Sequence, residues 1–383
     1  MRKLLCAAAL VASVMAVPAI PADAAPISPV GTVTASAPLN RALWIPGTAA
    51  AYRLTSVTTD AFGQQALSTG ELFLPNGTAP PGGWPVISWA HGTSGLGDSC
   101  APSVAGPADR DRDFEYLNTW ITQGYAIVAS DYAGLGTPGL PAYLNGRSEA
   151  HNVVDMVKAG RAYAQQNLPA AQQLSRKWVT IGQSQGGGAA IYTARYATEF
   201  GGADLDYRGA VGTGTPAYIE NLVSTLAPKL PPVALPAGMT AYLSYILSSL
   251  RYVHPELGID SILTDTGRKY LALAQTRCIF DFENDVRGVN VGDFVTAPVR
   301  SLPNWTAIID DYMAMPESGY DKPFFMGHGL LDTDVPYPVT AAYVARLMAN
   351  RQPVTFKTYL ADHSGTLIQS RRDSVPFVRA LFS

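Results

Sequence analysis

A serine inside a glycine-rich pentapeptide is the sequence feature that most directly indicates chemistry. Residues 182–186 read G-x-S-x-G with Ser184 at the centre, and an apolar run at 178–181 precedes them. Glycines and alanines at 186–190 follow and favour the start of a helix. A sharp turn from a strand into a helix exposes a serine hydroxyl, and small neighbours let the backbone approach closely. Ser184 is therefore the candidate nucleophile, and an inert serine in a glycine-rich turn is the plainer alternative.

The nucleophile needs a general base, because a free hydroxyl reacts weakly at neutral pH. Of the five histidines, His151 begins a predicted helix, His254 lies in a later helical segment, and His91 and His328 each precede a glycine at the end of an apolar run. Only His363 leaves room for an acid after a late strand, in the chain order serine, acid, histidine. His363 is therefore the candidate base, whereas His91 is expected to shape a loop and His328 to pack under the acid's turn.

Two aspartates compete for the role of the acid, which holds the imidazole tautomer and stabilises the imidazolium. Asp332 and Asp334 both follow the apolar run at 323–326. Asp332 stands at the strand exit, three residues before Val335, which is the usual place for this acid. The sequence therefore favours Asp332 and leaves Asp334 as the alternative.

The tetrahedral intermediate of acyl transfer also needs hydrogen-bond donors for its oxyanion. One predicted donor is the backbone N–H of Gln185, the residue after the nucleophile. The second is expected from the loop at 91–95, which follows the apolar run at 85–90. Thr93 or Ser94 would supply it, with Thr93 preferred, unless this loop is only a glycine turn.

Metal and nucleotide motifs find no support in the sequence. No HExxH motif and no CxxC pair occurs. Asp109, Asp111 and Asp113 alternate with arginines, but they lack the glycine and closing glutamate of a calcium loop, so a solvated charged helix start is predicted. The glycines at 134–136 are too few for a dinucleotide-binding loop. We therefore expect no metal site and no cofactor.

The candidate site residues follow short apolar runs that alternate with helical patterns. Continuous apolar runs indicate strands covered on both faces, hence a parallel sheet, and an early hairpin precedes them. The predicted class is α/β, with a mostly parallel, doubly wound sheet. The predicted strands are 52–60, 65–75, 85–90, 125–130, 178–181, 210–212, 323–326 and 354–360, and the helices are 152–165, 187–200 and 338–350.

A mostly helical stretch at 216–302 interrupts this alternation and is predicted to be an inserted cap. Its segment 230–250 carries no charge. A membrane span is excluded because Pro231, Pro232 and Pro236 interrupt the segment. Two interpretations stay open: ordinary buried core, or a lid that covers a lipid-like substrate. The α/β core would then comprise 51–215 and 303–383, after an extended N-terminal arm at 25–50.

The N-terminus has the pattern of a secretory signal peptide at 1–24. Arg2 and Lys3 precede an apolar run at 4–20, and small residues stand at 22 and 24. A membrane anchor is the alternative, but the run is short for a span and contains a proline. The sequence therefore predicts a secreted protein.

Composition excludes two classes. Hydrophobic residues make up 47% and charged residues 15% of the 383 residues, which is not the composition of a disordered chain. The formal net charge is −3 and no basic cluster occurs, so a nucleic-acid partner is not expected.

Cysteine usage agrees with export. One of the three cysteines lies in the predicted signal peptide, which leaves Cys100 and Cys278. Two cysteines in an exported chain indicate one disulfide, and two buried free thiols are the alternative.

From about residue 40 to its end the sequence resembles the secretory lipase family of the α/β-hydrolase superfamily. The resemblance implies an α/β-hydrolase fold with a helical lid after the sixth strand, and ester hydrolysis by Ser184, Asp332 and His363. In the best-known member an acidic side chain helps to form the oxyanion hole, where this sequence has Thr93 and Ser94. The matching pieces are 85–93, 100–103, 130–136, 182–187, His328-Gly329 with Asp332, Val335-Pro336 and His363.

The leading hypothesis is an exported, cofactor-free carboxylic ester hydrolase that acts on a lipid or other hydrophobic ester. The expected partner is this ester, with transient contact to a lipid interface allowed and no obligatory protein partner indicated. The family includes long-chain lipases and short-chain esterases, so chain length does not carry over. An acyltransferase with the same triad and an alcohol or sugar acceptor is the main alternative; a prolyl-type peptidase and a non-enzymatic role fit less well.

Overall fold

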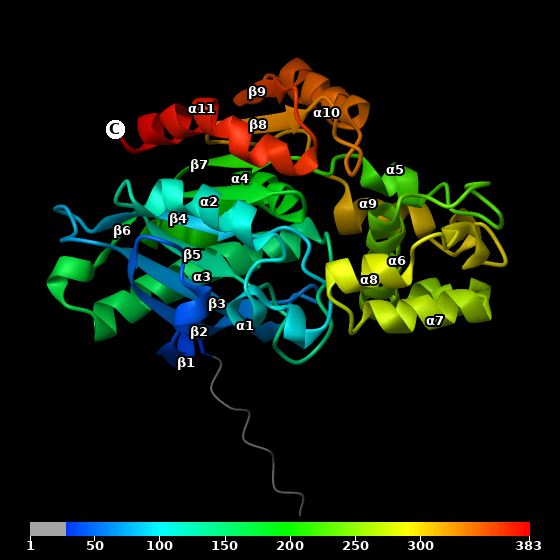
Figure 1. The fold of residues 1–383 in the computed structure, drawn as a ribbon, viewed down its shortest axis with the longest axis horizontal. Coiled ribbons are helices and arrows are strands. Elements are labelled where there is room, and N and C mark those ends of the chain that lie inside the picture. The colour runs from blue at the N-terminus through cyan, green and yellow to red at the C-terminus, as the bar shows by residue number, and fades with distance from the viewer. Residues whose placement is uncertain (1–27) are drawn as a thin grey trace, which may run out of the picture.

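The structure, a computed structural model, describes residues 28–383, so the predicted signal peptide lies outside the described residues. One nine-stranded sheet, in the order β1-β2-β3-β5-β4-β6-β7-β8-β9, runs through the protein (Figure 1). The strands are β1 (Val33–Pro38), β2 (Thr48–Thr59), β3 (Gln65–Pro75), β4 (Trp84–Ala90), β5 (Ala126–Ser130), β6 (Leu174–Gln183), β7 (Asp206–Thr213), β8 (Phe324–Gly329) and β9 (Val354–Tyr359).

The sheet changes direction at β5. Strands β1, β2, β3 and β5 pair antiparallel, and every pairing from β5 through β4 to β9 is parallel. The central strands are buried on both faces, as their continuous apolar runs indicate. The predicted α/β class with a mostly parallel, doubly wound sheet is therefore confirmed.

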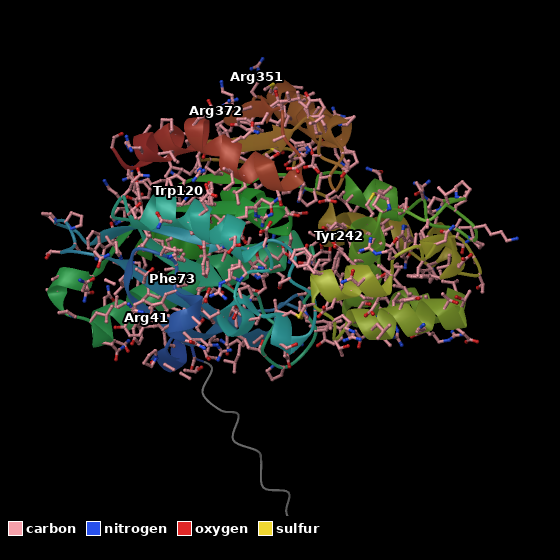
Figure 2. All side chains as sticks on the ribbon, in the orientation of Figure 1. Arg41, Phe73, Trp120, Tyr242, Arg351 and Arg372 are labelled. Carbon is pink, nitrogen blue, oxygen red and sulfur yellow. A yellow bond between two sulfur atoms is a disulfide. The ribbon has the colours of Figure 1, made fainter. Side chains whose placement is uncertain are left out.

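Helices cover both faces of the sheet. On one face pack α2 (Arg110–Ile121) and α11 (His363–Phe382), in the cluster that includes Phe73 and Trp120 (Figure 2). The other face is covered by α3 (Gly146–Asn167), α4 (Gln185–Gly201) and α10 (Tyr337–Ala349), and the short helix α1 (Pro102–Ala105) contacts β3.

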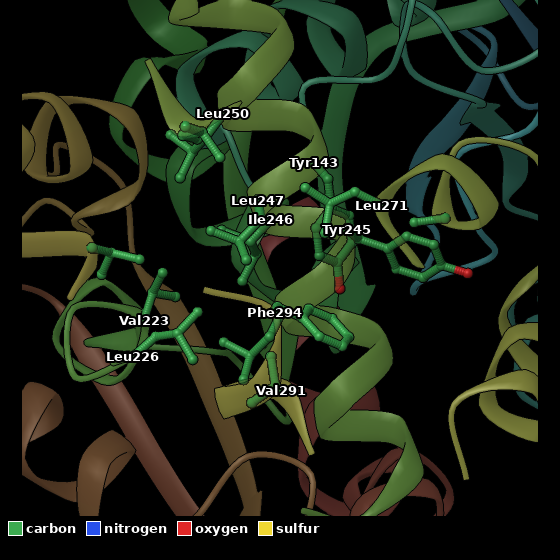
Figure 3. Close-up of a cluster of buried hydrophobic side chains, with 14 of the residues drawn as sticks. Tyr143, Val223, Leu226, Tyr245, Ile246, Leu247, Leu250, Leu271, Val291 and Phe294 are labelled. Carbon is green, nitrogen blue, oxygen red and sulfur yellow. The ribbon is translucent and has the colours of Figure 1, made fainter. Parts of the chain in front are cut away.

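Between β7 and β8 the chain forms helices that gather at one end of the sheet (Figure 1). They enclose a hydrophobic cluster to which Tyr143 of the sheet domain also belongs, and Figure 3 shows part of it. Trp305, Ile309 and Tyr312 of the last helix belong to this cluster, so by packing the helical segment extends past the predicted boundary at residue 302. The helices are α5 (Ile219–Val223), α6 (Ala237–Val253), α7 (Asp265–Ala274), α8 (Ile279–Asp285) and α9 (Trp305–Met313).

Part of the predicted N-terminal arm is a strand of the sheet. β1 pairs with β2 and forms an edge, and its residues are mostly exposed. An exposed edge strand carries little apolar patterning, which is why its composition resembled a linker. In the described part of the chain no helix is long and apolar enough to cross a membrane.

Candidate active site

Ser184 lies on a strained turn between β6 and α4. Its backbone has φ 58° and ψ −123°, a conformation that costs a non-glycine residue of order 1–3 kcal/mol. The N–H of Ser184 donates to the carbonyl oxygen of Thr213 at 2.9 Å, and its own carbonyl accepts from Gly188 at 3.0 Å. These bonds hold the serine at the carboxyl end of the sheet, where ligands bind in open α/β folds.

The glycines around Ser184 make room for this turn. A Cβ on Gly182 would overlap the carbonyl of Gly186, and one on Gly186 would overlap the carbonyl of Ala90. On Gly187 a Cβ would come within 2.6 Å of the Thr213 carbonyl oxygen. The spacing of G-x-S-x-G therefore reflects close backbone contact between β4, the turn and α4.

Gly186→Ala is accordingly expected to destabilise the fold by about 3 kcal/mol or more, because backbone atoms cannot yield to the added methyl group. Gly188→Ala is the matched control, since its Cβ would meet Pro216 at an ordinary 3.6 Å. Thermal unfolding of both variants, with soluble yield as a second readout, measures the difference. Equal midpoints for the two variants would contradict this account of the turn.

His363 begins α11 and is hydrogen-bonded to Asp332 in the loop after β8. The distance from His363 Nδ1 to Asp332 Oδ2 is 2.7 Å. The other carboxylate oxygen accepts from the N–H groups of Asp334 and Val335 at 3.0 and 2.8 Å. Burial acts to raise the pKa of Asp332, but the bond and charge of His363 and the Val335 N–H outweigh it and hold this pKa below its ordinary value.

Of the two candidate acids, only Asp332 is hydrogen-bonded to His363. Asp334 lies at the same pocket, and its pKa is raised, mainly by burial. His328 is fully buried beside them, with Nε2 donating to the carbonyl of Val335 at 2.9 Å. It thus packs under the acid's turn, as the sequence predicted.

Ser184 and His363 line one pocket of about 390 Å³. His363 is 9% exposed, and its Nε2 has no hydrogen-bond partner in the described residues. No hydrogen bond joins Nε2 to the Ser184 hydroxyl in residues 28–383, which is common for a catalytic pair without substrate. A larger pocket of about 770 Å³ lies beside the cap, and neither Ser184 nor His363 lines it. Pocket size alone therefore does not identify the active site.

The two predicted oxyanion donors flank the serine. Gln185 is the first residue of α4, and the first N–H groups of a helix have no acceptor within the helix. A Cβ on Gly92 would lie 3.6 Å from the Ser184 Cβ, which places the loop of Thr93 at the nucleophile. The Thr93 hydroxyl shares a 2.7 Å hydrogen bond with the Tyr143 hydroxyl. That contact leaves the Thr93 backbone N–H as the group available for an oxyanion.

A buried carboxyl group behind the site positions Gln185 and was missed in the sequence. Glu149 of α3 accepts from the side-chain amide of Gln185 at 2.7 Å and from the Leu144 N–H at 3.2 Å. Burial raises the pKa of Glu149 from 4.5 to about 7. No motif marks this residue, because the contact joins two helices far apart in sequence.

A carboxyl group whose pKa is raised on folding stabilises the protein at low pH. Glu149 contributes stability that is fully present below pH 4.5 and is lost as the pH rises through about 7. In Glu149→Gln this loss, about 3 kcal/mol from the size of the shift, is expected to disappear. Urea unfolding of wild type and variant at pH 4.5 and pH 8 measures it. An unchanged pH dependence in the variant would show that the pKa of Glu149 is not raised on folding.

The charged run at the start of α2 is not simply solvated, and that prediction is wrong for two of its members. The side chains of Arg112 and Asp113 are only 14% and 3% exposed. Arg112 contacts Asp113 at 2.8 Å, Asp109 at 3.4 Å and the Ser364 hydroxyl at 2.9 Å, so it braces the residue next to His363. Burial raises the pKa of Asp113 to about 6.

Cap residues close the pocket from the opposite side. Tyr242 of α6, which Figure 2 places where the cap meets the sheet, lines it together with Ile279, Phe280 and Glu283 of α8. Most apolar residues of α6, among them Tyr245 and Leu247, instead point into the cap's own cluster (Figure 3). The helical part of the uncharged run is therefore mainly buried core, and it does not by itself support a hydrophobic substrate.

A disulfide joins Cys100 of the sheet domain to Cys278 at the start of α8. Beside it the N–H of Ile279 donates to the carbonyl of Ser94 at 2.9 Å. The cap is thus bonded directly to the loop that carries Thr93. Within residues 28–383 no group of three or more His, Cys, Asp or Glu side chains could hold a metal ion.

The family model of secretory lipases matches residues 110–315, more than half of the chain. The chain belongs to the secretory lipase family. It is accordingly a carboxylic ester hydrolase. The match includes Ser184 and ends before Asp332 and His363, so the placement of these two rests on the geometry above.

Individual relatives of this secretory lipase are distant. Lipase A of Moesziomyces aphidis is 23% identical over 356 residues, 87% of this chain and 72% of that protein. A protein of Mycobacterium tuberculosis named "Probable inactive lipase" is 24% identical over 71% of this chain and 60% of its own length. Candida antarctica lipase A in its closed state superposes with a TM-score of 0.76 at 22% identity, over 92% of this chain and 82% of that one. This likeness shows the α/β-hydrolase fold.

Proposed function

We propose that this secretory lipase hydrolyses esters through an acyl-enzyme on Ser184, with His363 as general base and Asp332 as the orienting acid. The observation that carries the proposal is the Asp332–His363 hydrogen bond of 2.7 Å, which turns the unpartnered Nε2 of His363 toward the pocket that Ser184 lines. A histidine fixed in this tautomer can accept the serine proton.

The reaction follows from these positions. The Ser184 hydroxyl attacks the ester carbonyl while His363 Nε2 takes its proton, and the Asp332 carboxylate stabilises the resulting imidazolium. The N–H groups of Gln185 and Thr93 hold the oxyanion, a contribution of roughly 3 kcal/mol per donor. His363 then protonates the departing alkoxide, and water repeats the sequence on the acyl-enzyme. None of these steps calls for a metal or an organic cofactor.

We propose further that the protein is secreted after removal of residues 1–24. N-terminal sequencing of the mature protein is expected to begin at Ala25. A protein that keeps Met1 in the membrane fraction would favour the anchor instead.

The test of the function is a series of p-nitrophenyl esters from acetate to palmitate, together with labelling by a fluorophosphonate. We expect hydrolysis with an optimum at short acyl chains, because the pocket of about 390 Å³ is near the small end for ligand sites. Mass spectrometry should locate the label on Ser184. A folded protein that cleaves no ester and takes no label would overturn the proposal. Ester products that appear only with an added alcohol or sugar would favour the acyltransferase.

A further inference from the structure

The catalytic pocket is rich in charge, and most of this charge is negative. Four carboxyl groups and two guanidinium groups line it, those of Asp109, Asp113, Glu283, Asp334, Arg112 and Arg287. A site for a purely aliphatic ester would be predominantly apolar. The charged lining therefore indicates a substrate with a polar or charged group, which membership of the family alone does not indicate.

The guanidinium groups leave two of the carboxylates without a partner. Arg112 is engaged by Asp113, Asp109 and Ser364. Arg287 is exposed and donates to the side chain of Asn284 at 3.1 Å. In the described residues Glu283 and Asp334 have no ion pair within 4.0 Å, and their side chains have no hydrogen bond, although Arg287 lies near enough to act on Glu283 through space.

These two carboxylates line the same pocket as Tyr242, and Glu283 lies beside the ring of this tyrosine. A Cβ on Gly238 would lie 3.2 Å from Glu283 Oε1 and 3.5 Å from the Tyr242 hydroxyl, so both side chains flank this glycine. Burial raises the pKa of Glu283, and the charge of Asp334 raises it further. Two like charges that line one pocket are stabilised by a cation between them.

His363, whose side chain is partly exposed, lines the same pocket, so a ligand that reaches the base also reaches Glu283 and Asp334. We propose that the pocket selects esters that carry a quaternary or protonated ammonium group, held between Glu283, Asp334 and the ring of Tyr242. Carboxylates attract the ammonium charge, and an aromatic face binds it through the cation–π interaction. The inference rests on the proposed function and deepens it by naming a substrate class.

The experiment compares esters of equal shape that differ only in charge. The acyl-side pair consists of the p-nitrophenyl esters of 4-(trimethylammonio)butyrate and 5,5-dimethylhexanoate. The alcohol-side pair consists of acetylcholine and 3,3-dimethylbutyl acetate. In at least one pair the cationic ester is expected to have a kcat/KM about tenfold above its neutral partner at low ionic strength. Added salt should reduce this ratio.

Glu283→Gln should lower the cationic-to-neutral ratio at least about threefold, because it removes one of the two charges. Using the ratio cancels any general loss of activity. Asp281→Asn, on the exposed side of the same helix, is the matched control and should leave the ratio unchanged. A ratio of one or less in both pairs, or an equal fall in the two variants, overturns the inference while hydrolysis of the neutral esters keeps the proposed function. Absence of all hydrolysis and of Ser184 labelling overturns both.

Discussion

Ser184→Ala is expected to lower kcat for ester hydrolysis about a million-fold, since loss of the serine from a working triad removes nearly all covalent catalysis. The protein should stay folded, because the methyl group of alanine fits wherever the serine side chain fits. The backbone at φ 58° disfavours alanine no more than serine. Turnover of p-nitrophenyl acetate, with circular dichroism as the folding check, measures the effect.

Ser175→Ala is the matched control for this variant. Ser175 lies on the same strand β6 as the turn, away from the pocket, and its hydroxyl only accepts from the Lys177 N–H at 3.1 Å. This variant should keep wild-type kcat and the fluorophosphonate label. If Ser184→Ala retained more than about one part in a thousand of the activity, the covalent mechanism would be wrong. Without the serine, only the oxyanion donors and substrate binding contribute to the remaining rate.

A secretory lipase needs this test because the fold does not guarantee turnover. One relative of this chain bears the name of a probable inactive lipase at 24% identity, about the same identity as an enzyme named Lipase A. Whether a protein of this fold is active or inactive depends on the residues of its site. Here Ser184, His363 and Thr93 line one pocket, the backbone of Ser184 is strained, and the buried Asp332 is hydrogen-bonded to His363.

Sequence alone predicted the parts of the molecule whose signal is local. The apolar runs at 85–90 and 178–181 are the strands β4 and β6, and the G-x-S-x-G motif lies on the turn that its spacing predicted. Both faces of these strands are buried, so their composition alone identifies them. The order Ser184, Asp332, His363 was likewise predicted from where the apolar runs end. The hydrogen bond between Asp332 and His363 agrees with it, and the catalytic role of the three residues stays a prediction.

Contacts between segments far apart in the chain could not be predicted from the sequence. Arg112 and Ser364 are 252 positions apart. Nothing near Arg112 in the sequence distinguishes an arginine that bonds to the first turn of α11 from a solvated one. Glu149 and Gln185 likewise meet only once two helices pack. In both cases burial decides the role of the charged group, and burial depends on the tertiary fold.

The apolar segment of the cap illustrates a different limit. A helix that is apolar around most of its circumference is buried, but the sequence does not say against what. In α6, Ile246 and Leu247 pack into the hydrophobic cluster of the cap, whereas Tyr242 lines the catalytic pocket. The expectation of a lipid-covering lid followed from composition, whereas the charged lining of the pocket became visible only in three dimensions.

The second large effect concerns the acid. Asp332→Asn is expected to lower kcat about ten-thousand-fold at neutral pH, because an amide would favour the wrong tautomer of His363 and could not stabilise its imidazolium. A second signature is pH-dependent stability. Since the pKa of Asp332 is held below 3.8, the carboxylate stabilises the fold above this pH and loses that effect as the pH falls further. The difference in unfolding free energy between wild type and variant should therefore shrink below pH 3.8.

Asp334→Asn decides whether the correct aspartate has been chosen. Its carboxylate has no hydrogen bond to His363 in the described residues and acts on the imidazole only through space, so kcat for a neutral ester should fall by at most about tenfold. Comparing the two variants on p-nitrophenyl acetate at pH 8 removes any contribution of substrate charge. If Asp334→Asn suffered the larger loss, Asp334 would be the orienting acid, and the 2.7 Å bond between Asp332 and His363 would have to be exchanged for another when substrate binds.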